Sequence, residues 1–331
     1  MVLVAGQLDP FPMGWFCVAM SEEVPRGGVL GRTFGGREVV VFRGHSGRVS
    51  VLNAYCPHLG AHMAKGGRVE GDTLRCPFHG FRFDHDGRCV STEYGQKAPP
   101  TARTTPWEVC EQNGLILVWI GVGAPTFSVP PLDDTNWTPP IHKLLRLNSH
   151  PQETTENSVD LGHLAAVHGY RNVSQTGEPE ARGAYLGLRY AMTRRNPFFG
   201  GLGSITTDFD VHVHGLGHSL VDIRPRKAAG MHLRLFVLPS PCDGKGVELR
   251  IAVSVERTFP VPFGLAERVV GRIGLMSINH DVKQDFDIWQ NKVWVARPAI
   301  AKGDGPISLY RAWCRQFYPS PPPVAQDIAI A

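Results

Sequence analysis

Two short loops, each with one cysteine and one histidine, constrain this chain more than any other part of its sequence. The first reads Cys56-Pro-His58-Leu-Gly60 and the second reads Cys76-Pro-Phe-His79-Gly80. The spacing inside each pair is short, so each pair lies on one loop. The stretch between them, Leu59 to Arg75, is long enough for a hairpin that brings the second loop over the first. Four soft and imidazole groups on two facing loops predict a metal centre.

Two cysteines and two histidines fit two kinds of metal centre. One is a tetrahedral structural zinc, and spacing alone does not exclude it. The other is a [2Fe–2S] cluster in which two cysteines hold one iron and two histidines hold the other. Zinc fingers usually place both cysteines on one side and both histidines on the other, whereas each loop here carries one of each. Prolines after the cysteines, with Gly60 and Gly80 farther along, permit tight loops whose amides point at sulfur. These features favour the iron–sulfur cluster.

Length, charge and cysteine content indicate the class of protein. A chain of 331 residues exceeds one ordinary core, so two domains are expected. The net charge of +4 is mild, no basic block stands out, and no nucleic-acid partner is expected. Beyond the two loop cysteines, the five others show no disulfide spacing, which indicates a reducing compartment: Cys17, Cys89, Cys110, Cys242 and Cys314.

The sequence contains no recognisable signal peptide or transmembrane segment. Met1 to Gly14 lacks a basic region, and Asp9 and Pro10 interrupt its apolar run. The longest apolar run, Leu115 to Val122, is far too short to cross a membrane. We therefore expect a cytoplasmic protein.

Short apolar runs between glycine-rich turns predict an all-β domain over residues 14–125. Strands are expected at Gly14–Met20, Arg37–Arg43, Arg48–Ala54, Phe81–Asp84, Trp107–Cys110 and Leu115–Ile120. Asp86-Gly87 and Asn113-Gly114 are hairpin turn signals. Frequent prolines then indicate a linker over residues 126–150.

Residues 151–331 predict an α+β domain, an antiparallel sheet flanked by helices, so the whole chain is expected to be α+β. Helices are expected over about residues 152–169 and 263–295. The strands expected between them are Ile205–His214, Ser219–Arg224, Met231–Leu238 and Val247–Arg257.

A second group of potential ligands lies between Glu156 and His168. Asp160 and His163 are three residues apart, so they share a helix face. His163 and His168 are five apart, about 140° around a regular helix. One metal ion reaches both only if the helix is unwound or widened between them, which often marks a functional site. Alone, the pattern also fits two unrelated surface or core histidines.

The two groups together resemble the motifs of Rieske non-haem iron oxygenases, the family of ring-hydroxylating oxygenase alpha subunits. C-P-H-L-G with C-P-F-H-G is similar to the family's Rieske domain. The resemblance implies that Cys56, His58, Cys76 and His79 hold a [2Fe–2S] cluster, which stores one electron and does nothing to carbon. A separate mononuclear Fe(II) held by two histidines and a carboxylate keeps positions open for O2 and substrate.

The pattern N-x-x-D-x-x-H-x4-H over residues 157–168 resembles that iron site. It implies that His163 and His168 are ligands of Fe2+, and that Asp160 is hydrogen-bonded to His163 and to His79 of the neighbouring subunit. The family's third ligand is an aspartate on a C-terminal helix. Asp285 is favoured over Asp287, and only one of them can point inward. Asn157 is expected beside the site, with helix capping as an alternative role.

The end of the chain resembles one branch of the family, the 3-ketosteroid 9α-hydroxylase oxygenases and Rieske cholesterol 7-desaturases. The matching segments are Asp287-Ile-Trp289, Gly303 to Ile307, Trp313 and Gln316-Phe-Tyr318. The resemblance implies the terminal oxygenase of a monooxygenase, which uses O2 to hydroxylate or desaturate an apolar, fused-ring, steroid-like substrate. The alternatives are a non-steroid substrate (arene hydroxylation, demethylation or oxidative cyclisation), an electron-transfer Rieske protein, and a degenerate oxygenase used as a regulatory or binding subunit.

The electrons must come from another protein. No GxGxxG opens a βαβ unit and no flavin motif is present, so we expect a separate NAD(P)H-dependent reductase, with or without a ferredoxin between them. The resemblance also implies a head-to-tail homotrimer, in which an electron crosses from one subunit's cluster to the next subunit's iron through His79, Asp160 and His163.

Overall fold

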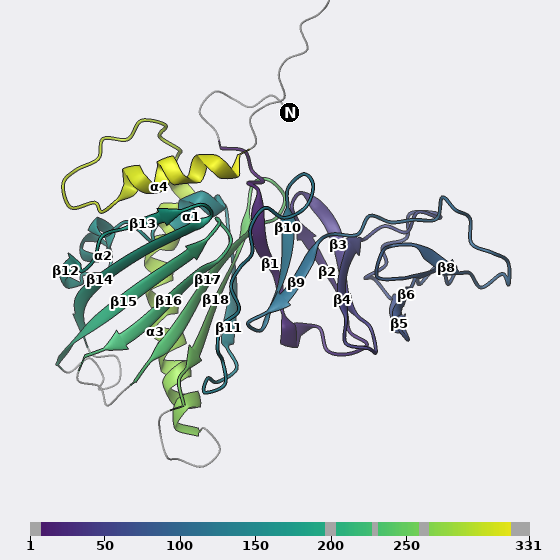
Figure 1. Ribbon diagram of the computed structural model, residues 1–331, viewed down its shortest axis with the longest axis horizontal. Coiled ribbons are helices and arrows are strands. Elements are labelled where there is room, and N and C mark those ends of the chain that lie inside the picture. Colours follow the sequence, from purple (N-terminus) through teal and green to yellow (C-terminus); the bar gives the residue numbers. More distant parts are fainter. Residues whose placement is uncertain (1–7, 196–202, 227–230, 258–264, 319–331) are drawn as a thin grey trace, which may run out of the picture.

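The computed structural model describes residues 8–195, 203–226, 231–257 and 265–318. Figure 1 shows a β-rich N-terminal region beside one large twisted sheet that carries the helices. All strand pairs in both parts are antiparallel, and the predicted α+β class is confirmed.

The N-terminal region is all-β, as predicted, apart from the 3-10 turn Ser21–Glu23. One sheet has the order β1-β10-β9, one β2-β3-β4 and one β5-β6-β7-β8. Asn113 and Gly114 have φ values of 56° and 75°, as the turn of the β9–β10 hairpin requires. The strands are β1 (Gly14–Met20), β2 (Val29–Phe34), β3 (Arg37–Arg43), β4 (Val49–Asn53), β5 (Arg68–Glu70), β6 (Thr73–Arg75), β7 (Arg82–Phe83), β8 (Cys89–Ser91), β9 (Val109–Gln112) and β10 (Leu115–Ile120).

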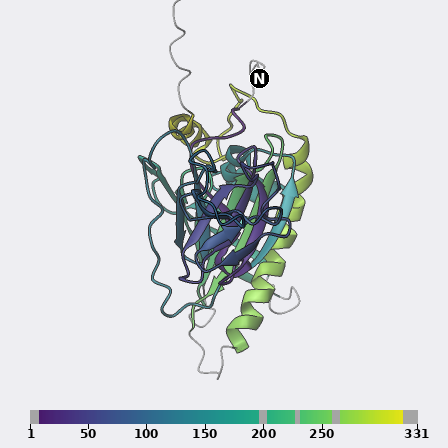
Figure 2. The same ribbon diagram turned by 90° about the vertical axis from the view of Figure 1, so that its right-hand side faces the viewer.

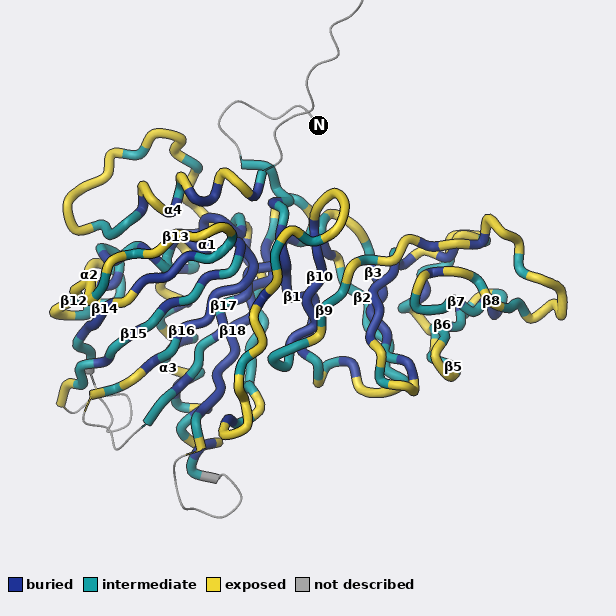
Figure 3. Tube along the Cα trace, viewed as in Figure 1, coloured by how far each residue is buried: buried dark blue, intermediate teal, exposed yellow. Residues whose placement is uncertain are grey.

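The C-terminal region is built on an eight-stranded sheet of order β11-β18-β17-β16-β15-β14-β12, with β13 also paired to β14. The four strands that the sequence predicted lie within a few residues of β15 to β18. The strands are β11 (Ile141–Leu147), β12 (Arg171–Gln175), β13 (Glu180–Arg182), β14 (Tyr185–Arg195), β15 (Ser204–His214), β16 (Ser219–Pro225), β17 (Leu233–Pro241) and β18 (Val247–Val255). Figure 3 shows that buried residues follow β1, β10 and β18, whereas β12 and β13 at the far edge of the sheet are largely exposed.

The long helix α3 (Leu265–Asn291) covers one face of this sheet, and Figure 2 shows it along one side of the molecule. Cβ atoms added to Gly271 and Gly274 would lie 3.3 Å from Val255 and 3.8 Å from Val253 on β18, so these glycines allow a close approach. The predicted helix began at residue 263, outside the described residues, and extended past the observed end. In the described part of the chain, no helix has both the length and the apolar character needed to cross a membrane.

The segment predicted as a linker, residues 126–150, includes strand β11. This strand pairs with β18 along its whole length, from Ile141 opposite Val253 to Leu147 opposite Val247. The sequence did not reveal this strand, because prolines are frequent just before it. The last of them directly precedes Ile141, the first paired residue. Residues 141–147 are thus part of the C-terminal sheet, and the domain boundaries stay a proposal.

A buried arginine connects the two regions across the other face of the sheet. Arg250 is 0% exposed, and its guanidinium donates to the carbonyls of Cys17 (3.0 Å) and Val18 (2.8 Å). These carbonyls lie at a break in the β1–β10 register. Glu248 lies 3.1 Å from the same guanidinium and balances its charge. The buried charge thus fixes how the N-terminal region sits on the sheet.

Candidate metal centres

The two cysteine loops share one backbone conformation. In each loop the cysteine N–H donates to the carbonyl five residues later, that of Ala61 or Phe81, at 2.8 Å. The cysteine carbonyl accepts from the glycine four residues later, Gly60 at 2.9 Å or Gly80 at 3.2 Å. These glycines have φ values of 74° and 66°, a region that other residues seldom adopt. The predicted hairpin between the loops is β5–β6.

The four candidate cluster ligands converge at the tips of these loops. The rings of His58 and His79 lie with their centroids 4.7 Å apart, and both cysteines are buried. Burial raises the pKa of the Cys56 thiol to about 12; the backbone amide of His58 opposes this rise and the neighbouring Cys76 thiol adds to it. Two neighbouring buried thiols become thiolates only beside positive charge.

One imidazole atom supports the same interpretation. The Nδ1 atom of His58 is buried and has no hydrogen-bond partner among the described residues. An unpaired buried nitrogen is costly unless it binds something. The donor set of two thiols and two imidazoles therefore fits a [2Fe–2S] cluster.

The segment predicted as one helix over residues 152–169 is instead two short helices, α1 (Pro151–Glu156) and α2 (Gly162–Ala166). Asp160 precedes α2, and its Oδ1 accepts from the backbone N–H of His163 at 3.1 Å. It thus caps the helix start rather than sharing a helix face with His163. His168 lies beyond the end of α2, so a helix end, and not an unwound turn, separates the two histidines.

Three potential ligands from two distant segments meet here. One ligand atom each of His163, His168 and Asp285 lies within 4.8 Å of the others. Nδ1–H of His163 donates to the Asp160 carbonyl at 2.6 Å, and Nδ1–H of His168 donates to Gln284 Oε1 at 2.8 Å. Both Nε2 atoms are therefore left to bind a metal ion, in the arrangement usual for histidine ligands.

The carboxylate of Asp285 completes the group. Its Oδ1 lies 3.5 Å from Nε2 of His168, and its Oδ2 accepts from Nδ2 of Asn157 at 3.3 Å. Asn157 thus contacts Asp285 with its side chain, at the C-terminal end of α1. Asp285 is 6% exposed, whereas Asp287 is exposed on α3. The geometry therefore favours Asp285 as the carboxylate ligand.

Charge in this group is balanced locally. Burial alone would lower the pKa of His168, but Asp285 and Gln284 outweigh burial and the pKa is raised. Burial alone would raise the pKa of Asp160, but its hydrogen bonds with His163 lower it. Two imidazoles and one carboxylate with anchored orientations fit a mononuclear Fe2+ that keeps positions open for O2 and substrate.

Behind this group lies a buried ionic cluster that the sequence did not reveal. Arg311 on α4 (Ile307–Cys314) donates to both carboxylate oxygens of Glu156, at 2.6 and 3.0 Å. Lys292, just after α3, lies 2.7 Å from Glu153 and 3.6 Å from Glu156. The cluster joins α1, α3 and α4, which is followed by the 3-10 turn Arg315–Phe317. The sequence hinted at one member of this cluster, because Glu156 directly precedes Asn157. In the same way Gln284, which holds the His168 ring, directly precedes Asp285.

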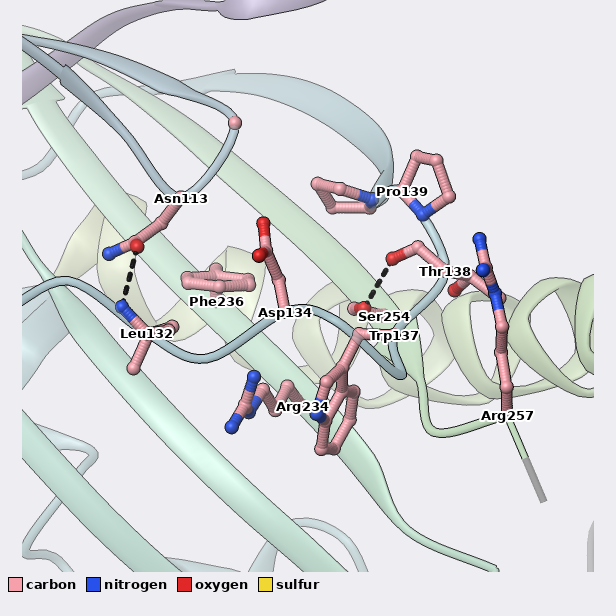
Figure 4. A pocket seen from close by; sticks show the side chains of 12 residues that line it. Asn113, Leu132, Asp134, Trp137, Thr138, Pro139, Arg234, Phe236, Ser254 and Arg257 are labelled. Carbon is pink, nitrogen blue, oxygen red and sulfur yellow. Dashed lines mark hydrogen bonds between the residues drawn. The ribbon is translucent and has the colours of Figure 1, made fainter.

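A pocket of ≈ 250 Å³ lies away from both metal centres, where residues 132–140 cross the large sheet (Figure 4). Arg234 stacks over the ring of Trp137 at 3.8 Å, and Ser254 Oγ donates to the carbonyl of Thr138 at 2.6 Å. None of the candidate ligands lines this pocket.

Two family descriptions divide the chain. Residues 14–105 match the Rieske [2Fe-2S] domain, and residues 121–318 match the 3-Ketosteroid 9alpha-hydroxylase C-terminal domain. The first matched segment contains the two cysteine loops, and the second contains His163, His168 and Asp285.

Relatives and solved structures agree with this division. Cholesterol 7-desaturase nvd 1 of Ciona intestinalis is 32% identical over 95% of this chain and 70% of its own length. A 3-ketosteroid-9-alpha-monooxygenase, oxygenase component, of Rhodococcus rhodochrous is 27% identical over 96% and 84%. Dicamba monooxygenase bound to 3,6 dichlorosalicylic acid shares the fold, with a TM-score of 0.74 at 20% identity over 92% of this chain and 96% of that one. The chain therefore belongs to the Rieske non-haem iron oxygenases, as its two metal motifs predicted, and to the members with a 3-ketosteroid 9α-hydroxylase C-terminal domain.

Proposed function

We propose that this enzyme is the terminal oxygenase component of a monooxygenase system that hydroxylates or desaturates an apolar, steroid-like substrate. The observation that carries the proposal is the convergence of His163, His168 and Asp285 in a chain that also carries the Rieske loops. An electron carrier has no use for this second site. The names of the relatives, one for cholesterol and one for 3-ketosteroids, support the substrate class.

In this proposal Cys56, His58, Cys76 and His79 hold the cluster, and His163, His168 and Asp285 hold the iron. When bound, the iron supplies the activation of O2 needed to attack an unactivated C–H bond. The protein's contribution is orientation. The Asp160 carbonyl and Gln284 each fix one imidazole through Nδ1, and Asn157 holds Oδ2 of Asp285, so that Oδ1 is left to face Nε2 of His168.

We further infer a head-to-tail trimer, in which one subunit's cluster serves the iron of the next. Figure 1 supports this, because β6 and β8 beside the cluster loops lie at the opposite end of the molecule from α2. The apolar tips of the two loops are exposed, Leu59 by 65% and Phe78 by 61%. When a neighbouring subunit covers these tips, His79 of the first subunit comes to lie near Asp160 of the neighbour.

A separate NAD(P)H-dependent reductase, with or without a ferredoxin, supplies the electrons in this proposal. The relative from Rhodococcus rhodochrous is named as an oxygenase component, which supports this division of labour. We also propose a reducing compartment such as the cytoplasm, because the five cysteines outside the cluster loops are not joined in disulfides.

A single turnover tests the substrate class. The reduced, iron-loaded enzyme is mixed with O2 and a panel of sterols, 3-ketosteroids and smaller arenes, and product masses are read. Gain of one oxygen on a steroid is expected for a hydroxylase, and loss of two hydrogens for a desaturase. If no steroid is changed although the iron is fully loaded, the steroid assignment is wrong.

Replacing Asp160 tests the path between the metals. Asp160→Ala should leave the cluster spectrum intact and abolish turnover, because it removes the carboxylate that is proposed to contact His79 and that accepts from the His163 backbone N–H, although the backbone carbonyl that holds the His163 ring remains. Asp160→Asn is the matched variant, since its amide oxygen still accepts from the His163 amide and preserves the helix cap. Turnover retained in both variants would rule out a path through this carboxylate.

A further inference from the structure

We propose that a groove on the Rieske domain, lined by Arg37, Arg103 and Tyr55, docks the electron-donor protein through carboxylates on that protein's surface. The inference rests on the proposed function, since an oxygenase without its own reductase needs such a surface. The groove has a volume of ≈ 450 Å³, and Glu38, Asn53, Thr104 and Thr105 also line it.

The floor of the groove is rigid, because backbone hydrogen bonds tie its three segments together. Asn53 N–H donates to the Thr105 carbonyl at 2.9 Å, and Thr104 Oγ1 donates to the Asn53 carbonyl at 3.0 Å. Ala54 N–H donates to the Glu38 carbonyl at 2.9 Å. A surface that does not rearrange loses little entropy when a partner binds, which suits a brief electron-transfer encounter.

The charges of the groove are positive and available. Arg37 and Arg103 are exposed, and neither has an ion-pair partner among the described residues. The one carboxylate that lines the groove, Glu38, is already engaged: it accepts from Thr33 at 2.5 Å and lies 3.4 Å from His62. Two free guanidinium groups therefore face the solvent here, and they would attract and orient a partner with surface carboxylates.

The same imbalance extends over this domain. In the described part of residues 14–120, the exposed carboxylates without an arginine or lysine partner are Glu22, Asp72 and Glu108, half the number of the unpaired basic side chains. The exposed basic side chains without an ion pair are Arg26, Arg37, Lys65, Arg88, Lys97 and Arg103. A domain with this distribution attracts an acidic protein over a distance, and not only a single small anion.

The groove also reaches the cluster loops by a short route. Tyr55 lies in the groove with 54% of its surface exposed, and the next residue, Cys56, is a candidate cluster ligand that is 2% exposed. The Tyr55 ring packs against His62 with the ring centroids 5.2 Å apart. A donor seated on Tyr55 is thus one residue from a cysteine of the cluster, and exposed tyrosines are typical contact residues of protein interfaces.

Cluster reduction measured by stopped flow tests the docking surface. The oxidised holoenzyme is mixed with a reduced plant-type [2Fe–2S] ferredoxin, an acidic protein whose potential lies below that of Rieske clusters. The methyl viologen radical, a small cation, is the comparison reductant. The variants are Arg37→Gln, Arg103→Gln and their combination. Arg272→Gln, which removes an exposed positive charge from α3, is the matched control.

We expect the ferredoxin rate constant of the double variant to fall about tenfold at low ionic strength, and its salt dependence to flatten. The Arg272→Gln rate should match that of the unchanged protein, and methyl viologen should reduce all variants alike. An equal loss in Arg272→Gln, or none in the double variant, overturns the docking surface. If inorganic phosphate binds the unchanged protein but not the double variant, while ferredoxin rates are equal, the groove is only a small-anion site. Failure of methyl viologen to reduce any variant would instead refute the cluster, and with it the proposed function.

Discussion

The two candidate metal centres are built in opposite ways. The cluster loops occupy 25 consecutive residues, 56–80, and each loop is closed by its own backbone hydrogen bonds and a glycine of positive φ. The iron group joins residues 157–168 with Asp285, far along the chain. The contacts that hold its two parts together are therefore all between distant segments. A centre of the first kind depends on loop chemistry, whereas the second depends on the packing of whole helices.

The packing of α3 shows what that dependence means. Ile278, Val282, Asp285 and Trp289 are buried on one stripe of the helix, with spacings of four, three and four residues. Asp285 therefore takes a position that an apolar residue would normally fill. Its burial is tolerated because Asn157 and His168 contact it. Damage to helix packing should therefore affect the iron group first and leave the loops intact.

The largest effect is expected from Asp285→Asn, which attacks the non-local centre alone. Loss of the anionic ligand should reduce mononuclear iron and lower turnover by at least about 100-fold, because changes even outside the ligand shell cost 10 to 100-fold. The visible spectrum of the cluster should not change. Iron per chain, the spectrum and turnover are the measurements.

Asp287→Asn is the matched control for this change, because it alters the same charge two residues away at an exposed position. It should behave like the unchanged protein. Loss of iron in Asp287→Asn with retention in Asp285→Asn would reverse the ligand assignment.

A moderate effect is expected from Arg311→Met, which breaks the ionic cluster behind the iron group. It leaves the buried Glu156 without its bidentate partner, and removing one member of such a pair costs about 3 kcal/mol or more when burial is complete. We expect somewhat less here, since Lys292 lies 3.6 Å away. Iron should be lost at lower urea concentrations, before the cluster spectrum changes.

Adding Glu156→Gln to Arg311→Met is the control, because it removes the unpaired charge and should recover part of the stability. If the cluster and the iron were lost together in the single variant, the two centres would not differ in their dependence on packing.

The smallest effect is expected within the cluster loops, from Gly60→Ala and Gly80→Ala. Both place alanine at positive φ, at a cost of about 1 kcal/mol. A Cβ at Gly60 meets nothing within 4 Å, whereas one at Gly80 would overlap the Glu93 side chain. Glu93 must then leave Arg75 and Arg82, which lie 3.2 and 2.8 Å away. Thermal loss of the cluster spectrum should therefore shift more for Gly80→Ala. The reverse order would contradict the loop geometry.

Local spacing accounts for what the sequence predicted well. The ranges of β1 and β3 agree with apolar runs bounded by glycine, and the Asn113-Gly114 turn has the backbone that its residues favour. The motifs of the two metal centres also lie in short segments, so the family could be recognised from them. Helix ends were harder to predict: the helix expected over residues 152–169 ends at Glu156 and resumes at Gly162, where the Asp160 carboxylate accepts from the His163 N–H.

The sequence by itself determined the all-β N-terminal region, the antiparallel C-terminal sheet and the candidate ligands within residues 56–80 and 157–168, because these follow from residue types at short spacings. Only the tertiary structure decided that β11 joins the sheet, that Asp285 rather than Asp287 faces His168, and that Glu156 pairs with Arg311. Each of these depends on contacts between residues a hundred or more positions apart. Pairing over such distances is set by which faces pack together, and no local pattern specifies that choice.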